Sequence, residues 1–250
     1  MTMKALWWYD ESRIAGMARP GLNSTRWFDF TFEEAVLVGW IGQHASGSTS
    51  LDDFERHVRS YGHKLLSYYQ LDEDLARAPF RIFETPDGVA SVLKSLAERS
   101  GWLTSYDVLN REIHFAFNPK RLDWEIAQLK QLGISHVVTL TERPHKREIL
   151  EKHFAIHHFS ITDLEPPKLD QVLQFAALIE TLRGRGEKMA VHCLAGIGRT
   201  STMIIAAHLA LGEKVDDLRQ RIAHRNPVFD PSDSQAEFIR TMAEHFSRST

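Results

Sequence analysis

The sequence predicts an α/β fold: a three-layer domain with a central, mainly parallel sheet flanked by helices, accompanied by a mostly helical N-terminal insertion. In the C-terminal half, short β-branched segments alternate with amphipathic segments of helical period. The 250 residues leave room for one large domain, or for an ordinary domain with an addition. With 43% hydrophobic and 25% charged residues, the composition is that of a globular chain and excludes one that is mainly disordered.

The helices and strands of the C-terminal half are predicted from their hydrophobic period and from the glycines at their ends. Apolar residues at helical spacing stop before Gly133 and Gly212, as they do at a helix C-terminus. We expect strands over residues 134–140, 155–161 and 188–192, and helices over residues 123–132, 170–182, 199–211, 214–224 and 234–246. Because strands and helices alternate, neighbouring strands are expected to be parallel.

The N-terminal part is less regular, and no motif assigns chemistry to it. We expect helices over residues 32–41, 51–69 and 89–99, with a Gly/Ser/Thr loop over residues 45–50 between the first two. Its tryptophans are expected to build a small core of its own.

Charge and cysteine content exclude several classes of function. A net charge of −3 gives no reason to expect nucleic acid or a membrane as a partner. No apolar run approaches the roughly 18–20 residues that cross a bilayer, and the first ten residues lack the apolar core of a secretory signal. Cys193 is the only cysteine, which excludes an intramolecular disulfide and a Cys-rich zinc site. We therefore expect a cytoplasmic protein.

We expect neither a metal nor a cofactor. His153, His157 and His158 fall on an expected strand without matching carboxylate spacing, so they are expected to face solvent. Gly196 and Gly198 lack the third glycine of a dinucleotide-binding turn, and no Gly-Lys-Ser/Thr follows them.

Residues 191–200 read Val-His-Cys-Leu-Ala-Gly-Ile-Gly-Arg-Thr and combine the features of an anion-binding loop. The strand over residues 188–192 delivers Cys193 to the carboxyl edge of the sheet, where α/β proteins bind ligands. Glycines allow a tight turn with inward N–H groups, and the following helix directs its positive end to the same point. Arg199 can hold two phosphoryl oxygens, and this field favours the thiolate form of the cysteine.

The flanking polar residues have expected roles in the same loop. The Thr200 hydroxyl can donate to the sulfur and stabilise it as an anion and as a leaving group. His192 is expected to orient the loop through its ring N–H rather than to act as a base.

The pattern His-Cys, five residues, Arg and Thr resembles the signature of the cysteine-based protein tyrosine phosphatase superfamily, and its dual-specificity branch more than the receptor-type catalytic domains. The resemblance implies that Cys193 attacks phosphorus in line. The phosphate is then bound by Arg199 and by the loop amides of Leu194, Ala195, Gly196, Ile197 and Gly198. It also implies a general acid on an upstream loop.

The family's acid loop is similar to residues 161–167, Ile-Thr-Asp-Leu-Glu-Pro-Pro, which follow an expected strand. Asp163 lies 30 residues before Cys193 and is the expected acid, with Glu165 as the reserve candidate. The alternative for Asp163 is a surface turn, which Asp and Pro both favour. Further along, residues 226–239 resemble the segment that places a glutamine over the pocket, so Gln235 is expected to position the hydrolytic water. The alternative for Gln235 is an exposed helical residue.

The resemblance also suggests how the chain is divided. Residues 129–142 look like the family's first helix and strand, and residues 15–21 look like the segment that normally precedes them. We therefore expect a catalytic domain made of residues 1–21 and 118–250, with an insertion at 22–117. The competing arrangement is an independent N-terminal domain, in which case the similarity of residues 15–21 is accidental.

Three functions remain open at this point. The first is a metal-independent phosphatase for phosphotyrosine proteins, with phosphoserine or phosphothreonine as further substrates. Leu194, Ala195 and Ile197 are uncharged, whereas phosphoinositide-directed relatives usually carry lysines there, so a lipid or other small phosphomonoester is the less favoured substrate. The second is a phosphoprotein-binding module without turnover. The third is thiol redox or sulfur transfer, which the lack of a second cysteine disfavours.

Overall fold

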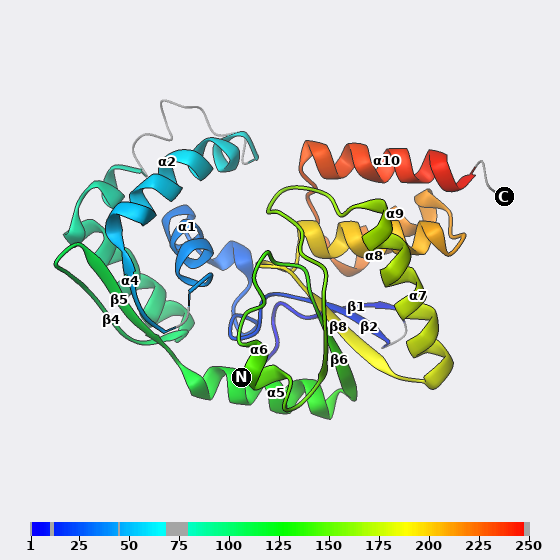
Figure 1. The fold of residues 1–250 in the computed structure, drawn as a ribbon, viewed down its shortest axis with the longest axis horizontal. Helices are drawn as coiled ribbons and strands as arrows, with labels where there is room; N and C mark the ends of the chain where they lie inside the picture. Colours follow the sequence, from blue (N-terminus) through cyan, green and yellow to red (C-terminus); the bar gives the residue numbers. More distant parts are fainter. Residues whose placement is uncertain (1, 11–12, 45, 69–79, 248–250) are drawn as a thin grey trace. The chain divides into compact units, whose positions relative to one another are not determined.

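The structure is a computed structural model that describes residues 2–10, 13–44, 46–68 and 80–247 (Figure 1). It divides into two compact units. The first comprises Met1–Asn23 and Glu125–Thr250, and the second comprises Ser24–Trp124. Ala45 and Tyr69, which we expected in a loop and at a helix end, lie outside the described residues.

The first unit is built on a five-stranded sheet with the strand order β1-β2-β8-β6-β7. Its strands are β1 (Trp7–Asp10), β2 (Ile14–Met17), β6 (Ile134–Thr139), β7 (Ala155–His158) and β8 (Lys188–His192). β1 pairs with β2 antiparallel, whereas the pairs β2–β8, β8–β6 and β6–β7 are parallel. The predicted central, mainly parallel sheet is thus confirmed, and strands from both ends of the chain share it.

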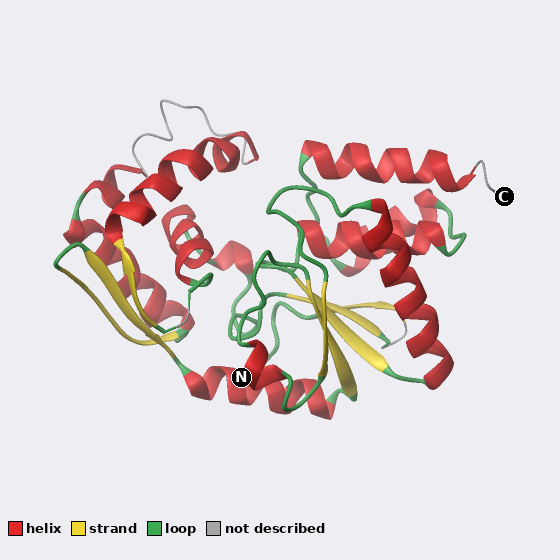
Figure 2. Cartoon of the chain, viewed as in Figure 1, coloured by secondary structure: helices red, strands yellow, loops and turns green. Residues whose placement is uncertain are grey.

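Six described helices belong wholly or partly to this unit, and loops gather at one end of the strands (Figure 2). They are α5 (Pro119–Gln131), α6 (Arg147–Leu150), α7 (Leu169–Arg185), α8 (Gly198–Ala210), α9 (Val215–Arg225) and α10 (Asp233–Ser247). Five of them coincide with predicted helices to within a few residues. The prediction for residues 155–161 was too long: the regular strand ends at His158, and beyond it only Phe159 and Ile161 still donate to carbonyls of the β6 end.

Helix α8 is the centre of the hydrophobic core. Its residues from Arg199 to Leu209 are buried, and α7, α9 and α10 pack around it. A helix that is buried all round needs cover on every side, and the sheet contributes to it through Met189 and Val191. The start of α8 is therefore held rigidly against the end of β8.

The parallel register brings three strand ends to one edge. Met17 of β2 and Thr139 of β6 both lie opposite His192, the last residue of β8. The segments that leave these strands therefore begin side by side, although they lie far apart in the sequence.

The second unit combines helices with a small sheet. The helices are α1 (Phe32–Ile41), α2 (Leu51–Tyr68) and α4 (Pro86–Ser100), with short 3-10 turns η1 (Trp27–Asp29) and η2 (Ile82–Glu84). The sheet contains β3 (Gly47–Ser50), β4 (Leu103–Leu109) and β5 (Glu112–Phe117) in the order β3-β5-β4, and both pairs are antiparallel. The unit is mostly helical, as predicted.

The small sheet was not predicted, and the expected loop over residues 45–50 was wrong where β3 forms. Its sequence, Gly-Ser-Thr-Ser, has the composition of a turn, and only pairing with β5 makes it a strand. The β4–β5 turn has Asn110 and Arg111 at positive φ, which is the backbone of a two-residue hairpin without the glycine that usually marks one.

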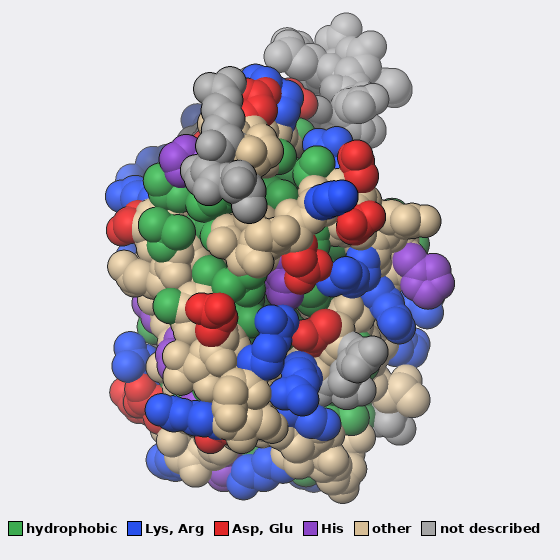
Figure 3. Space-filling model, turned by 90° about the vertical axis from the view of Figure 1, so that its right-hand side faces the viewer, with side chains coloured by type: hydrophobic (Ala, Val, Ile, Leu, Met, Phe, Trp, Pro, Cys, Tyr) green, Lys and Arg blue, Asp and Glu red, His purple; other side chains and the backbone are tan. Residues whose placement is uncertain are grey.

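Among the described helices, none combines the length and hydrophobicity that a membrane span requires. On the face drawn in Figure 3, acidic and basic side chains are intermixed rather than gathered by sign.

Candidate active site

Cys193 is the first residue after β8 and lies in the turn that connects this strand to α8. Its side chain is free and buried. The backbone N–H of Gly196 donates to its sulfur at 3.3 Å, so the loop folds over the sulfur as the glycine-rich sequence predicts.

Gly196 is the position at which the loop can carry no side chain. Its φ is +77°, and a Cβ there would lie 2.4 Å from the backbone C and O of Met17 and 2.7 Å from the N of Ala18. Trp7 donates from its indole Nε1 to the Gly196 carbonyl at 3.3 Å. The N-terminal segment thus forms a wall against which the loop is packed.

Arg199 lies in the first turn of α8 and is only 3% exposed. Its Nη1 donates to the carbonyl of Ile161 at 2.9 Å and to Glu142 Oε2 at 3.1 Å, and its Nη2 pairs with Asp163 Oδ1 at 2.8 Å. Burial acts to lower the pKa of Arg199, but the charges of Asp163, Cys193 and Glu142 outweigh it and raise the pKa. The guanidinium is therefore a permanent cation at the mouth of the loop.

Glu142 is a site residue that the sequence analysis did not single out. One carboxylate oxygen accepts from Arg199, and the other accepts from the backbone N–H of Asp163 at 2.7 Å. It therefore fixes the arginine and the expected acid relative to each other. The available signal was its place just beyond the buried strand β6, at the edge where α/β proteins carry functional side chains.

The loop that carries Asp163 is held by side chains from the start of α10. The hydroxyls of Ser232 and Ser234 both donate to the carbonyl of Leu164, at 2.5 Å and 2.9 Å. Leu164 has a φ of +65°, a left-handed backbone conformation that is uncommon for leucine and that sets the direction of this carbonyl. We call Ser232, Ser234 and Gln235 the clasp, because Gln235 Nε2 also donates to the Glu165 carbonyl at 3.2 Å.

The structure separates the two candidate acids. Asp163 is 27% exposed and contacts Arg199, whereas Glu165, two residues further along the loop, is exposed. Gln235 is 2% exposed rather than on an open helix face. It also lies against the loop from the end of β8 to the first residue of α8, residues 193–198, which we call the phosphate loop after its expected ligand: a Cβ on Gly198 would be 2.9 Å from Gln235 Oε1. The predicted residues Cys193, Arg199, Asp163 and Gln235 thus come from segments that meet around one loop.

The side chain of His192 ties the loop to the neighbouring strand. Its Nδ1 is 3.0 Å from the Cys193 carbonyl, and its Nε2 is 2.9 Å from the Thr139 hydroxyl. Burial lowers the pKa of His192 to about 4, so the ring is neutral at pH 7. Because a carbonyl only accepts, Nδ1 carries the proton and Nε2 accepts from Thr139.

The expected hydrogen bond from Thr200 to the cysteine sulfur is not formed. The Thr200 hydroxyl is fully buried and has no hydrogen-bond partner in the part of the chain that the structure describes.

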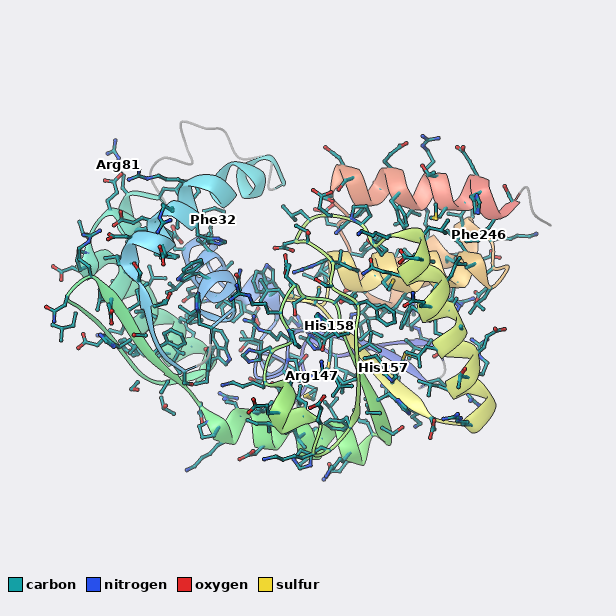
Figure 4. The ribbon with its side chains drawn as sticks, viewed as in Figure 1. Phe32, Arg81, Arg147, His157, His158 and Phe246 are labelled. Atoms are coloured by element: carbon teal, nitrogen blue, oxygen red, sulfur yellow. The ribbon has the colours of Figure 1, made fainter. Side chains whose placement is uncertain are left out.

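The histidines near β7 are occupied with one another and with the backbone. His157 Nε2 is 3.0 Å from His136 Nδ1, and His158 Nε2 donates to the Thr141 carbonyl at 2.8 Å (Figure 4). His153 Nδ1 lies 3.1 Å from the Lys130 ammonium. Within residues 2–10, 13–44, 46–68 and 80–247, no three His, Cys, Asp or Glu side chains gather as metal ligands would.

Comparison with known proteins connects this geometry to a family. Residues 118–213 match the family model described as "Tc-R-P: Polymorphic toxin system, DSP-PTPase phosphatase". The matched segment includes β6, the acid loop, Cys193 and Arg199. This segment of the chain is thus similar to dual-specificity phosphatases, which agrees with the resemblance that the sequence around Cys193 predicts.

Two relatives that match this chain have different substrates in their names. The phosphatidylglycerophosphate phosphatase PTPMT1 of Arabidopsis thaliana is 32% identical over 87 residues, covering 32% of this chain and 26% of the relative. The tyrosine-protein phosphatase CDC14 of Saccharomyces cerevisiae is 27% identical over 187 residues, covering 73% of this chain and 29% of the relative. The matched stretches thus span little more than a quarter of either relative's own length.

Solved phosphatase structures are also similar to this one. Tk-PTP in its active form has 24% sequence identity and a TM-score of 0.45, covering 49% of this chain and 86% of that one. Human DUSP28 has 16% identity and a TM-score of 0.44, covering 50% of this chain and 87% of its own.

Proposed function

We propose that this protein is a phosphatase of the dual-specificity-like branch of the cysteine-based protein tyrosine phosphatase superfamily. In this proposal it hydrolyses phosphotyrosine in proteins, with phosphoserine and phosphothreonine as further substrates, through a cysteinyl-phosphate intermediate. One observation carries the proposal: Asp163 Oδ1 lies 2.8 Å from Arg199 Nη2. Arg199 is in the first turn of α8, the helix that follows the loop around Cys193. A nucleophile, a phosphate-binding cation and a proton donor are thereby available at one strand edge.

The proposed reaction has two steps. The Cys193 thiolate attacks phosphorus and forms an S–P bond as the P–O bond to the leaving oxygen breaks, and Asp163 donates a proton to that oxygen. Loop amides of residues 194–199 and the Arg199 guanidinium stabilise the charge on the three equatorial oxygens. In the second step, Gln235 positions a water and Asp163 takes its proton. The water oxygen then displaces the sulfur and releases inorganic phosphate.

The ion pair between Asp163 and Arg199 suggests how substrate binding prepares the acid. A phosphoryl dianion on Arg199 competes with the Asp163 carboxylate for the same guanidinium. The added negative charge favours the protonated carboxyl, which is the form that a general acid needs. Glu142 stays bonded to the backbone of Asp163 and would keep the side chain near the leaving oxygen.

Neutral residues in the loop favour a protein substrate over a highly charged lipid headgroup. Leu194, Ala195 and Ile197 offer no cation above the phosphate. The alternative, a phosphoinositide or another small phosphomonoester, is supported by the relative whose name specifies phosphatidylglycerophosphate. Rates of phosphate release from matched phosphotyrosine, phosphoserine and phosphothreonine peptides and from dispersed phosphoinositides decide between these substrates.

The first test is hydrolysis of p-nitrophenyl phosphate with a chelator present. We expect turnover without added metal and none in Cys193→Ser, which keeps the size of the side chain but not the nucleophile. Activity that survived in Cys193→Ser would overturn the mechanism. Stable binding of a phosphotyrosine peptide by the wild type, with no phosphate released, would instead support the non-catalytic binding module.

We also propose that residues 22–117 are an insertion within a catalytic domain made of residues 1–21 and 118–250. Support comes from β2, which precedes this block and pairs directly with β8, which follows it. The second compact unit ends slightly later than residue 117, at Trp124 inside α5. A variant with a short Gly/Ser linker in place of residues 25–117 tests this, since hydrolysis of p-nitrophenyl phosphate should persist. Loss of activity with retained folding would assign the block a part in catalysis.

A further inference from the structure

The segment that leaves β2 runs alongside the phosphate loop. In the parallel register Met17 lies opposite His192, so Ala18 and Arg19 continue beside the start of the loop. The backbone N–H of Arg19 donates to the Leu194 carbonyl at 3.0 Å. Gly196 of the same loop packs closely against the backbone of Met17 and Ala18, so the two segments touch at a second point. The backbone of Arg19 is therefore as firmly placed as the loop itself.

The side chain of Arg19 is buried next to the reacting groups. It is 3% exposed, as is Arg199. Burial and the charge of Arg199 together lower the pKa of Arg19 to about 9, against the charge of Cys193, which acts to raise it. The guanidinium thus lies within the electrostatic reach of both Cys193 and Arg199, and it stays protonated at pH 7.

A third cation lies near Arg19. Lys146 is half-buried in the loop that follows β6, and burial and the charge of Arg19 lower the pKa of Lys146. Arg19 is therefore acted on by cations from two other elements, α8 and the β6 loop. Repulsion among buried cations is costly, and a bound dianion between them relieves it.

We propose that Arg19 is a second phosphate-binding arginine, and that the phosphoryl dianion is held between the guanidinium groups of Arg19 and Arg199 above Cys193. The proposal rests on the proposed function in one respect, namely that this dianion is the substrate group or the product. The second arginine also explains how the site gains enough positive charge to hold a dianion. Arg199 is the cation at the end of the loop, and its N–H donors are shared with Asp163 and Glu142. Arg19 comes from the other end of the chain, so the signature around Cys193 does not include it.

The direct test is calorimetric titration of inorganic phosphate into the full chain. We expect Arg19→Met to weaken phosphate binding by roughly tenfold or more, the range of a lost charge-assisted hydrogen bond pair, and Arg19→Lys to restore part of it. Arg13→Met is the matched control, because Arg13 lies on the same N-terminal segment but its side chain is exposed and donates to the Arg183 carbonyl. That variant should bind phosphate as the wild type does.

A second readout separates binding from mere support of the loop. The rate of Cys193 alkylation by iodoacetamide against pH reports the thiolate, and Arg19→Met should move its midpoint to higher pH while Arg19→Lys keeps it near that of the wild type. If Arg19→Met fails to fold, as judged by thermal unfolding, Arg19→Lys and Arg19→Gln carry the same comparison.

The outcomes distinguish this inference from the proposed function. Wild-type phosphate affinity and an unshifted alkylation profile in a folded Arg19→Met protein would overturn the role of Arg19, even with full hydrolytic activity in the wild type. The opposite result is that the wild type binds phosphate, Arg19→Met weakens this binding, and the wild type does not hydrolyse p-nitrophenyl phosphate. That result would overturn the proposed function and support the role of Arg19 in phosphate binding.

Discussion

The two loops that meet at Arg199 are held in different ways. The phosphate loop is fixed by buried contacts, because Gly196 packs against the backbone of Met17 and Ala18 and the His192 ring donates to the Cys193 carbonyl. The acid loop is fixed by side chains from elsewhere: Glu142, the clasp and the pair of Asp163 with Arg199. The first cannot shift without disturbing the sheet edge, whereas the second can detach by breaking side-chain hydrogen bonds and one ion pair that reach it from other segments. Changes in the phosphate loop should therefore cost stability, and changes in the acid loop should cost turnover.

Gly196→Ala should have the largest effect on stability. The new Cβ would clash with the Met17 backbone and occupy a positive φ, so we expect the free energy of unfolding to fall by about 3 kcal/mol. Gly184→Ala is the control, because nothing lies within 4 Å of its Cβ and α7 is helical there. That change should raise stability by up to about 1 kcal/mol. Urea unfolding measures both, and a Gly196→Ala midpoint equal to that of the wild type would contradict the packing argument.

Asp163→Ala should affect turnover and leave stability nearly unchanged. Loss of a general acid lowers kcat by roughly 10²-fold or more when the leaving group is poor, as in phenyl phosphate, and less for p-nitrophenyl phosphate. Glu165→Ala is the matched control from the same loop, and it should retain activity because its carboxylate is exposed. An equal loss for both leaving groups would assign the acid to another residue.

His192 should make stability depend on pH. Since burial lowers its pKa in the folded protein from 6.5 to about 4, the unfolded chain binds the proton first as the pH falls. The contribution of His192 to the free energy of unfolding is full above pH 6.5 and declines as the pH falls towards 4. Between pH 7 and pH 5 it falls by about 2 kcal/mol.

Urea unfolding at the two pH values tests this prediction. The pH dependence should be weaker in His192→Gln than in the wild type, whereas His224→Gln, an exposed change on α9, should keep the wild-type slope. A slope in His192→Gln as steep as that of the wild type would show that other groups cause it.

The clasp should have the smallest effect. Ser232→Ala and Ser234→Ala each remove one hydrogen bond to the Leu164 carbonyl, worth about 1 kcal/mol, so we expect kcat to fall about fivefold with KM unchanged. Because both hydroxyls share one acceptor, the double variant should lose more than the two single losses combined. Ser247→Ala removes a similar bond at the far end of α10 and should be neutral. A rise in KM without a fall in kcat would place the clasp in substrate binding instead.

The sequence predicted correctly those parts of the structure that are formed by residues close together in the chain. The strand 188–192, the tight turn with its glycines and the helix after it are neighbours in the chain, so the position of Cys193 and Arg199 could be predicted from hydrophobic period and turn chemistry. Asp163 followed from its distance to Cys193 and from family resemblance. Prediction failed for β3, whose residues become a strand only through pairing with β5.

The sequence by itself therefore determined the fold class, the sulfur and the cation of the site, because these depend on consecutive residues. Tertiary structure alone decided that Glu142 joins the arginine to the acid loop, that Ser232 and Ser234 hold this loop, and that Arg19 lies beside Leu194. The physical reason is the parallel sheet, in which the carboxyl ends of β2, β6 and β8 converge at one edge regardless of how many residues separate them. Such neighbours leave no period or spacing in the sequence.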